Sequence, residues 1–503
     1  MKINEQATFS EVAECIADSI ETQCSHVSPP HDIAHTNSIE EEVLQKISLE
    51  PKDDLTHVSL SEVQTLVKSI STRKAPGLDS VSNKAIKCFS QSLLSLLVAI
   101  FNACLQNCYF PSAWKEAEVI GIHKPGKPRD LPASYRPISL LSSLAKLFER
   151  VLKTPLSNHL VGKGLIIDEQ FGFCPAHSCP QQVLRLVEYV SEGFKTKQKI
   201  VAVFFDLAKA FERVWRAKVP QGSALSPLLL YSAFTNVITR STSGVQLALF
   251  ADDTALFFRS RTRRSIFCHL PKAIDELGQW FRKWRIEVDP NKSAAIQFKY
   301  SKNRSKLVVN WNTPNLKMLN ARIPWQRSYK YLGVTLDKNL HFREYIARVR
   351  KNALFYTTRL GVMLGRKSKL SRRNKRTLYK MYIRTVMTYA CPVFAHAALK
   401  AIHRLQVIQN KFCRVATDAH WCVRNSILHR DLELPTLSKH IKDASKRFFD
   451  IAGSHPNALL SAAVYQPPPP THFIRRPRNV LIDPPDALTV AVDSLNDVND
   501  THD

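Results

Sequence analysis

Apolar and polar positions follow helical and strand-like patterns along most of the chain. In the segment SEVQTLVKSI, Val63, Leu66 and Val67 fall on one face of a helix. The continuous apolar run KIVAVFFDLA is typical of a buried strand, and we expect that strand to end at Asp206. The segment LALFADDTALFF predicts two strands joined by a tight turn. Beyond Leu340 the pattern is helical and basic.

The two ends of the chain carry too few apolar residues to form a core of their own. Residues 1–50 are polar and acidic, which predicts a linker. After Ser454 the chain includes four consecutive prolines, Pro467–Pro470, which predict a disordered tail. The most apolar run, Leu93–Leu105, is short and contains Ser95 and Asn102, so it predicts a core helix and not a membrane span.

Composition narrows the class of protein. The 503 residues are 44% hydrophobic, which is enough for two to four globular units. Lys and Arg number 71 against 43 Asp and Glu, a net charge of +28. Such a charge favours a polyanionic partner, because binding phosphates releases counterions; a solvated basic surface is the alternative. The 11 Cys are irregularly spaced and no signal peptide is evident, so we expect reduced thiols and no zinc site.

Two adjacent acids form the strongest local signal for chemistry. Asp252 and Asp253 lie between apolar segments, at the expected turn of the hairpin. Adjacent carboxylates repel each other, and a hard divalent cation with oxygen ligands relieves that repulsion. Taken alone, however, the pair is more simply an ordinary Asp-Asp turn, because Asp is common in turns.

Other segments of the sequence place polar groups where they can join these acids. Asp206, at the end of its apolar strand, can converge with the hairpin to hold two metal ions for phosphoryl transfer. Between them lies Pro220–Ser223, in which Gln221 and Gly222 open a predicted helix. Glycine there allows close approach of the backbone to a nucleotide, although a plain turn before a helix explains the segment equally well.

In this order, the three segments resemble motifs A, B and C of reverse transcriptases. The resemblance covers roughly residues 40–460, and an ordered set of motifs is far more specific than any one of them. The C-terminal stretch VIQNKFCRVATDAHWCVRNSILHRDLELPTL is similar to the jockey-like group of non-LTR retrotransposons (LINE elements). Further segments that match family motifs are Lys74–Asp79, Ile122–Lys127, Ser134–Ser139, Asp168–Phe173, Asp289–Lys292 and Tyr331–Gly333.

The resemblance implies an α+β fold in the form of a right-hand polymerase. Fingers would occupy residues 56–200, preceded by a polar linker at 1–55. A palm with a small antiparallel sheet would occupy residues 201–340, shortened near 216–219. A helical, basic thumb and C-terminal region would follow at 341–455, and the Pro-rich tail at 456–503 would be disordered.

The resemblance also implies roles for individual residues. Asp206, Asp252 and Asp253 would be the catalytic carboxylates and would hold Mg²⁺ or Mn²⁺. Residues that would contact or shape the site of the nucleotide are Lys124, Arg136, Phe211, Gln221, Gly222 and Lys292. Lys124 and Arg136 would bind the triphosphate, Phe211 would be the steric gate beneath the sugar, and Lys292 would donate a proton to pyrophosphate. Surface cations, core packing and a solvated lysine are the simpler alternatives for these four.

The implied function is that of an RNA-directed DNA polymerase (a nucleotidyltransferase) that extends a DNA primer on an RNA template with dNTPs. We expect an intracellular protein, in the nucleus, the cytoplasm or both, without a membrane partner. The oligomeric state stays open. No upstream endonuclease, zinc knuckle or RNase H domain is recognisable, which predicts a fragment of a longer element protein.

One departure from the family pattern bears on activity. Asp206 and Gln221 are only 15 positions apart, where the family has several dozen residues that build palm helices. The short interval suggests an excised segment, through genomic deletion or incorrect splicing. A second hypothesis is therefore a catalytically inactive remnant that binds nucleic acid, and a third is a gene product that never folds stably.

Overall fold

The structure is a computed structural model, and it divides into two compact units. It describes residues 57–129, 131–208, 244–284, 286–290, 292–300, 313–465 and 476–481, with scattered single positions elsewhere. Unit 1 comprises Met1–Cys174, Leu207–Arg240 and Asp275–Asp289. Unit 2 comprises Pro175–Asp206, Ser241–Ile274 and Pro290–Asp503. Each unit is described by itself.

Unit 1 is built mainly from helices that begin at serine caps. The side chains of Ser59, Ser82, Ser90 and Ser142 each accept a hydrogen bond from a backbone N–H of the first turn, which satisfies donors that the helix leaves free. The helical elements are α3 (Leu60–Ser69), α4 (Asn83–Lys87), α5 (Gln91–Gln106), η1 (Ser112–Trp114), η2 (Pro132–Ser134) and α6 (Ser143–Gly162).

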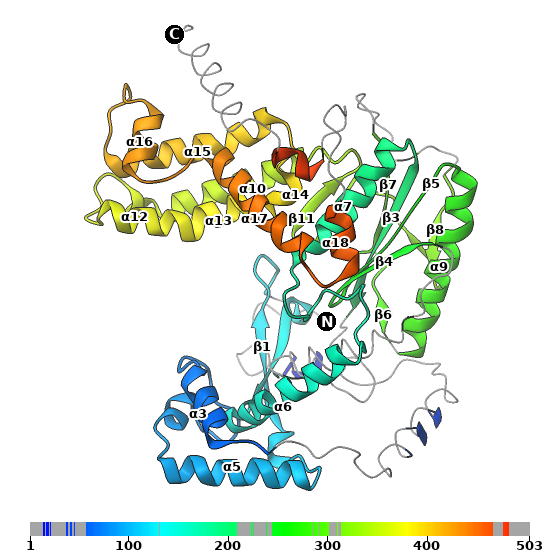
Figure 1. The fold of residues 1–503 in the computed structure, drawn as a ribbon, viewed down its shortest axis with the longest axis vertical. Coiled ribbons are helices and arrows are strands. Elements are labelled where there is room, and N and C mark those ends of the chain that lie inside the picture. Colours follow the sequence, from blue (N-terminus) through cyan, green and yellow to red (C-terminus); the bar gives the residue numbers. More distant parts are fainter. Residues whose placement is uncertain are drawn as a thin grey trace. The chain divides into compact units, whose positions relative to one another are not determined.

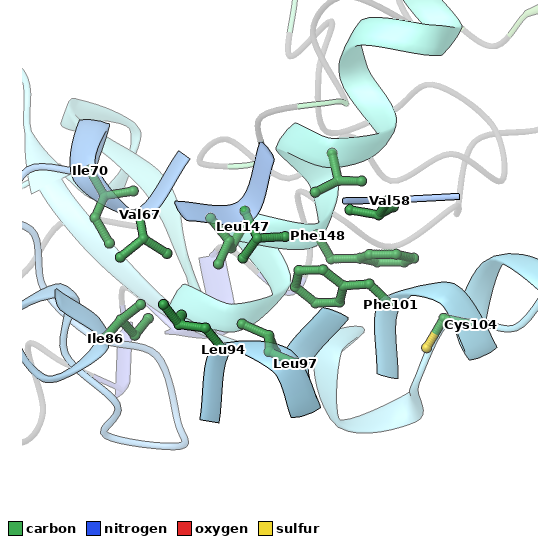
Figure 2. Close-up of a cluster of buried hydrophobic side chains, with 12 residues drawn as sticks. Val58, Val67, Ile70, Ile86, Leu94, Leu97, Phe101, Cys104, Leu147 and Phe148 are labelled. Carbon is green, nitrogen blue, oxygen red and sulfur yellow. The ribbon is translucent and has the colours of Figure 1, made fainter. Parts of the chain in front are cut away.

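The core of unit 1 lies among α3, α5 and α6. Val63 and Val67 of α3 are buried, as their helical spacing predicts. Phe101 of α5 and Phe148 of α6 are fully buried, with ring centroids 5.0 Å apart, and Figure 2 shows them at the centre of the cluster. The apolar run Leu93–Leu105 is therefore part of a core helix, as predicted.

Unit 1 also carries a long antiparallel hairpin. Strands β1 (Ala117–His123) and β2 (Tyr135–Leu141) pair along their whole length, from Ala117 opposite Leu141 to His123 opposite Tyr135. A short strand, β6 (Glu287–Val288), pairs with Leu207 and Ala208 at the end of β3.

Unit 2 contains a sheet whose central strand is β3 (Lys199–Ala208). Every side chain from Ile200 to Phe205 is almost fully buried, and β3 is flanked by β5 on one edge and by β7 on the other. The pairing is antiparallel throughout (Figure 1). The other strands are β4 (Gln246–Phe250), β5 (Asp253–Ser260) and β7 (Ala294–Phe298).

Two hairpins and two helices adjoin this sheet. Helix α7 (Cys179–Lys195) packs against β4 and β5, and most of its residues are buried. Helix α9 (Arg263–Lys283) follows β5 and crosses the boundary between the units. The small strands are β8 (Leu316–Met318), β9 (Ala321–Ile323), β10 (Ser328–Tyr331) and β11 (Val334–Asp337).

The remainder of unit 2 is helical, as the pattern beyond Leu340 predicts. Leu405, Ile408 and Phe412 form the buried stripe of α15. The helices gather into one group (Figure 1). They are α10 (Arg343–Arg359), α11 (Gly361–Leu364), α12 (Arg372–Leu378), the π-helix η4 (Tyr379–Arg384), α13 (Thr385–Thr388), α14 (Cys391–Phe394), α15 (Leu399–Thr417), α16 (Asn425–Asp431), α17 (Leu437–Gly453), α18 (Ala458–Tyr465) and η5 (Pro477–Leu481).

The prediction of a disordered tail at 456–503 is wrong for two segments. Helix α18 packs against α7 and α17, and buries Leu460 and Val464. The short helix η5 buries Pro477 and Val480. The composition of the tail predicted disorder. A few apolar residues are nevertheless enough to order a short helix when they pack against a surface that other elements have already formed. The proline run Pro467–Pro470 lies outside the described residues.

The mixed helix and strand content, with small antiparallel sheets, agrees with the predicted α+β class. Along the chain, the first division between the units falls after Cys174, because α7 packs on the sheet of unit 2. None of the described helices combines the length and apolar character needed to cross a membrane.

Candidate active site

The strand register brings two of the predicted carboxylates to the same end of the sheet. Asp206 of β3 lies directly opposite Asp253, the first residue of β5. Directly opposed residues on antiparallel strands are close enough for their side chains to interact. The apolar run that precedes each acid is buried, so the carboxylates mark the point where the sheet meets a polar surface.

Asp252 reaches the same place through the hairpin loop. Phe250 pairs with Asp253, which leaves Ala251 and Asp252 as a two-residue loop between β4 and β5. Ala251 has a φ of +54°, and a positive φ at the first loop position is typical of hairpin turns whose twist matches the strands. The predicted strand–turn–strand pattern is therefore confirmed, with the acids at the turn.

Burial and mutual repulsion raise the pKa of both hairpin acids. The pKa of Asp253 is raised to about 7, first by burial and then by the charges of Asp252 and Asp206, while Lys330 opposes the shift. Burial also raises the pKa of Asp252, and the charge of Asp206 adds to that effect. Carboxylates that carry this cost favour a bound cation, because a cation stabilises the ionised form.

Asp206 has partners of a different kind. Its Oδ2 lies 3.4 Å from Nζ of Lys292, and its backbone N–H donates to Oγ of Ser293 at 3.3 Å. Because the Asp206 and Lys292 side chains are 37% and 65% exposed, the ion pair is open to solvent and easily rearranged. Lys292 was predicted as a site residue, and the structure places it beside a predicted catalytic carboxylate.

The donor set suits a hard divalent cation, although the arrangement is not that of a preassembled metal site. Mg²⁺ and Mn²⁺ prefer carboxylate oxygens, and here the charge of Asp206 raises the pKa of both hairpin acids. Among the residues that the structure describes, no three His, Cys, Asp or Glu side chains are grouped closely enough to hold a metal. Side-chain rearrangement, including release of Asp206 by Lys292, would have to accompany binding.

The hairpin β10–β11 supports the carboxylates from one side. The ring of Tyr329 stacks on Phe204 of β3 with centroids 4.8 Å apart, and its hydroxyl donates to the carbonyl oxygen of Lys292 at 3.2 Å. Burial, together with the charges of Asp206 and Asp253, raises the pKa of Tyr329 to about 12. The segment that resembles motif E thus lies beside the acids.

Helix α7 supports the hairpin from its other side. Gln182 is fully buried, and its Nε2 donates to the carbonyl oxygen of Leu249 at 2.9 Å, one residue before the end of β4. Burial raises the pKa of the Cys179 thiol, and the charge of Asp253 adds to it. A strand end held by a buried amide has little freedom to shift, which favours a constant carboxylate geometry.

The two cations predicted to bind the triphosphate lie in unit 1, on the hairpin β1–β2. Arg136 of β2 pairs with Ile122, and Lys124 directly follows the end of β1, where its N–H donates to the carbonyl oxygen of Ser134 at 2.7 Å. The register brings Lys124 and Arg136 together near the loop end of one hairpin. They belong to a different compact unit from the carboxylates.

The remaining predicted residues, Phe211, Gln221 and Gly222, lie outside the described residues. Ser223, which directly follows Gly222, donates a hydrogen bond to Oε1 of Glu149 on α6 at 2.6 Å. This contact lies within unit 1.

The motif at Lys74–Asp79 has a structural explanation within unit 1. A Cβ on Gly77 would lie 2.6 Å from the backbone nitrogen of Ser142, so only glycine fits against the start of α6. The hydroxyl of Ser142 donates to Oδ2 of Asp79 at 2.5 Å. The glycine and the acid of this motif therefore join it to the end of β2.

Comparison with known families agrees with this geometry. The profile of the family described as "Reverse transcriptase (RNA-dependent DNA polymerase)" matches residues 122–219 and 216–336. Residues 122–336 therefore match the reverse transcriptase family. The matched region contains Asp206, Asp252 and Asp253. Its two parts overlap at residues 216–219, within the short interval between Asp206 and Gln221.

Several curated proteins resemble this chain over most of its length. It is 31% identical to "Probable RNA-directed DNA polymerase from transposon BS" of Drosophila melanogaster, over 89% of this chain and 54% of that protein. It is 31% identical to the same species' "Probable RNA-directed DNA polymerase from transposon X-element", over 90% and 54%. For "RNA-directed DNA polymerase from mobile element jockey" the identity is 30%, over 84% and 51%. The chain thus spans about half the length of these relatives.

Sequence reasoning missed Tyr329, Gln182 and Ser293 as supports of the carboxylates. The sequence contains a weak signal for Tyr329, because Tyr329 and Tyr331 occupy alternate positions of the strand-like segment Ser328–Tyr331 and so fall on one face. Gln182 and Ser293 had none, because their contacts join segments 67 and 87 positions apart.

Proposed function

We propose that the chain is an RNA-directed DNA polymerase of a non-LTR retrotransposon, which adds nucleotides to a primer 3′-hydroxyl. The observation that carries the proposal is the register of β3 and β5, which sets Asp206 opposite Asp253 beside the Asp252 loop. The family match over residues 122–336 supports the same reaction. The relatives described above are named as RNA-directed DNA polymerases, two of them as probable ones.

Asp206, Asp252 and Asp253 would hold two Mg²⁺ or Mn²⁺ ions. When bound, such ions activate the attacking hydroxyl and neutralise charge on the transferred phosphate. The carboxylates would lose their mutual repulsion on binding, so their ionised forms would dominate at neutral pH. Gln182, Ser293 and Tyr329 would keep the strand ends in place during the reaction.

Lys292 would change partner during the reaction. Its ammonium neutralises Asp206 in the described state, at 3.4 Å. A cation bound to Asp206 would weaken that pair and free Lys292 to donate a proton to the departing pyrophosphate. Lys124 and Arg136 would bind the triphosphate, while Phe211, Gln221 and Gly222 would shape the sugar and base pocket.

The architecture proposed for this function is a right hand. The helices and long hairpin of unit 1 would be the fingers, the sheet of unit 2 the palm, and helices α10–α17 the thumb. The net charge of +28 would attract an RNA template and a DNA primer through their phosphates. An intracellular place of action follows from these partners.

The test is primer extension on a defined RNA template with a 5′-labelled DNA primer. We expect products that require all templated dNTPs and Mg²⁺, and that disappear when a chelator is added. A DNA template of the same sequence measures template preference. Absence of any templated product, from protein that is folded by circular dichroism and binds the primer–template, would overturn the proposal of activity.

A second candidate function has its own motivation. Asp206 and Gln221 are 15 positions apart, and the family profile matches in two parts that meet at residues 216–219. Without supporting helices, the carboxylates would lose the accuracy that catalysis needs, since a displacement of about 1 Å costs orders of magnitude in rate. The chain would then bind nucleic acid and catalyse nothing.

The two candidate functions predict different transcripts. Sequencing complementary DNA across the codons for residues 206–221 distinguishes them. A longer transcript that restores the palm segment favours the polymerase. A confirmed junction, together with nucleic-acid binding but no synthesis, favours the inactive remnant.

A further inference from the structure

Unit 2 contains a charged cavity that the proposed reaction does not use. Its volume is about 260 Å³, and α7, β5, α17, α18 and η5 contribute to its lining. Figure 1 shows α18 beside α7, where these elements meet. Six Arg and Glu side chains line it: Arg185, Arg259, Arg476, Arg478, Glu188 and Glu192. None of the predicted site residues is among its lining residues.

The guanidinium groups are held in place by contacts within the protein. Arg259 lies over the ring of Tyr189, with 4.4 Å from Cζ to the centroid, and its Nη1 donates to the carbonyl oxygen of Tyr189 at 3.0 Å. Arg185 lies over the ring of Phe257 at 5.6 Å. Cations fixed in this way lose little conformational entropy when they bind a ligand.

The charges in the cavity do not balance. Four guanidinium groups face two carboxylates, and Glu192 is already neutralised by its ion pair with Arg476. Burial raises the pKa of Glu188 to about 7, although Arg476 and Arg478 oppose the shift. At neutral pH a large fraction of Glu188 is therefore uncharged, which leaves the cavity positive.

Apart from Tyr189 and Gln246, the remaining lining residues are apolar. Phe449 of α17 and Leu459 and Val464 of α18 contribute side chains of this kind. A cavity with a few fixed charged groups and a mainly apolar wall is typical of small-molecule sites.

We propose that this cavity binds a small organic anion. The anionic head, a phosphate or sulfonate, would be held by Arg259 and Arg478, and an aromatic or aliphatic body would pack against Phe257 and Val464. Guanidinium groups suit such a head because their fork of donors matches paired oxygens. The proposal is independent of polymerase activity, because binding alone tests it.

Benzenesulfonate is a suitable probe because its charge does not change between pH 6 and pH 8. Isothermal titration at constant ionic strength should detect binding to the full chain. Benzyl alcohol, which lacks the charge, should bind at least about tenfold more weakly. Arg478→Gln should weaken benzenesulfonate binding about tenfold, through loss of a charge-assisted hydrogen bond. Arg430→Gln is the matched control, since it removes the same charge from an exposed position outside the cavity.

The pH dependence gives a second, independent readout. Glu188 faces Arg476 and Arg478 of η5, Arg259 of β5, and Arg185, Tyr189 and Glu192 on its own helix, while α17 and α18 present apolar side chains. Ionised Glu188 repels an anion, so binding should weaken about threefold or more from pH 6 to pH 8. Glu188→Gln should bind more tightly at pH 8 and lose this dependence.

Three results would overturn the proposal. The first is no heat or thermal shift with benzenesulfonate at pH 6. The second is equal weakening by Arg430→Gln and Arg478→Gln, which would indicate diffuse attraction to a basic surface. The third is an unchanged pH dependence in Glu188→Gln, and this result decides the question even if Arg478→Gln fails to fold.

Discussion

Asp253 illustrates how one residue can be costly for the fold and useful for function. Its carboxylate is partly buried beside two other acids, and its pKa is raised to about 7. Ionisation is thus disfavoured in the folded protein without a cation. A bound divalent ion would remove the penalty, so the same feature that destabilises the hairpin would give it affinity for metal.

Replacement of Asp253 by Asn should stabilise the metal-free protein at pH 8. The folded chain holds the Asp253 proton more tightly than the unfolded chain, whose carboxyl has the ordinary pKa near 4. The free energy of unfolding therefore falls as the pH rises from about 4 to about 7. Asp253→Asn removes this loss. The free energy of unfolding of the variant should therefore exceed that of the wild type by at most about 4 kcal/mol at pH 8, and by little at pH 4.

Urea unfolding of both proteins at pH 4 and pH 8, with a chelator present, checks this prediction. Mg²⁺ should raise the stability of the wild type more than that of Asp253→Asn. Equal stability of the two proteins at pH 8 would contradict the electrostatic account of the site.

Tyr331→Phe should leave stability unchanged or raise it. Tyr331 is 1% exposed, and its hydroxyl has no hydrogen-bond partner among the described residues. Removal of such a group relieves a desolvation cost of about 1–3 kcal/mol. Tyr345→Phe is the matched control, because the Tyr345 hydroxyl donates to the carbonyl oxygen of Tyr389 at 2.8 Å.

Melting temperatures of the two tyrosine variants test the difference. Tyr345→Phe should melt below the wild type, by about 1 kcal/mol in the free energy of unfolding. If Tyr331→Phe lost as much stability as Tyr345→Phe, its hydroxyl would have a partner after all.

At the scale of elements, the hairpin β10–β11 depends on one glycine. Tyr331 pairs with Val334, which leaves a two-residue loop of Leu332 and Gly333. Both have positive φ, +46° and +83°, as a type I′ turn requires. The hydroxyl of Tyr389 donates to the carbonyl oxygen of Leu332 at 2.9 Å, and so fixes the loop that supports Tyr329 and Tyr331.

Gly333→Ala should destabilise unit 2. A Cβ at this position would meet Cε1 of Tyr389 at 2.9 Å, in a backbone conformation that alanine adopts only with strain. We expect a loss of about 1–3 kcal/mol. Gly361→Ala is the control, because nothing lies within 4 Å of the position that its new methyl group would take, and helix α11 favours alanine.

Thermal unfolding of both glycine variants provides the comparison. The melting temperature of Gly361→Ala should equal or exceed that of the wild type. A neutral effect of Gly333→Ala would mean that the loop adapts easily and does not position the strands beside the acids.

The elements near the site could be predicted where the signal is local. The apolar run before Asp206 and the apolar segments around Asp252 predicted β3 and the β4–β5 hairpin, because strand burial leaves a continuous pattern. The support by Gln182 could not be predicted, since it depends on α7 packing against a hairpin far along the chain. Helix α18 was missed for the same reason: its burial depends on α7 and α17.

Two features of the whole molecule favour different functions. The excess of positive charge favours nucleic-acid binding, whereas the short interval between Asp206 and Gln221 disfavours catalysis. The net charge of +28 favours a nucleic-acid partner. Asp206 and Gln221 are only 15 positions apart, so the sequence that the family uses behind its active site is missing between them. The chain would therefore be able to bind nucleic acid without synthesising DNA, so the two proposed properties need separate tests.

Nucleic-acid binding should weaken steeply with salt. Each phosphate neutralised by the protein contributes a slope of about −0.7 to −0.9 in log K against log salt concentration. Five or more contacts would lower the affinity for an RNA–DNA primer–template by at least about a hundredfold between 50 and 200 mM salt. Fluorescence anisotropy measures this dependence, and an affinity independent of salt would contradict phosphate contact as the main source of binding.

The central claim is that Asp206, Asp252 and Asp253 form the polymerase centre. Its most direct test is single-nucleotide incorporation on an RNA template with Mg²⁺, by the wild type and matched carboxamide variants. Asp206→Asn, Asp252→Asn and Asp253→Asn should each lower the rate by at least about a hundredfold, while primer–template affinity stays within about threefold. Asp431→Asn, at an exposed position on α16, should retain the wild-type rate. Incorporation that survives in Asp252→Asn and Asp253→Asn would contradict the claim.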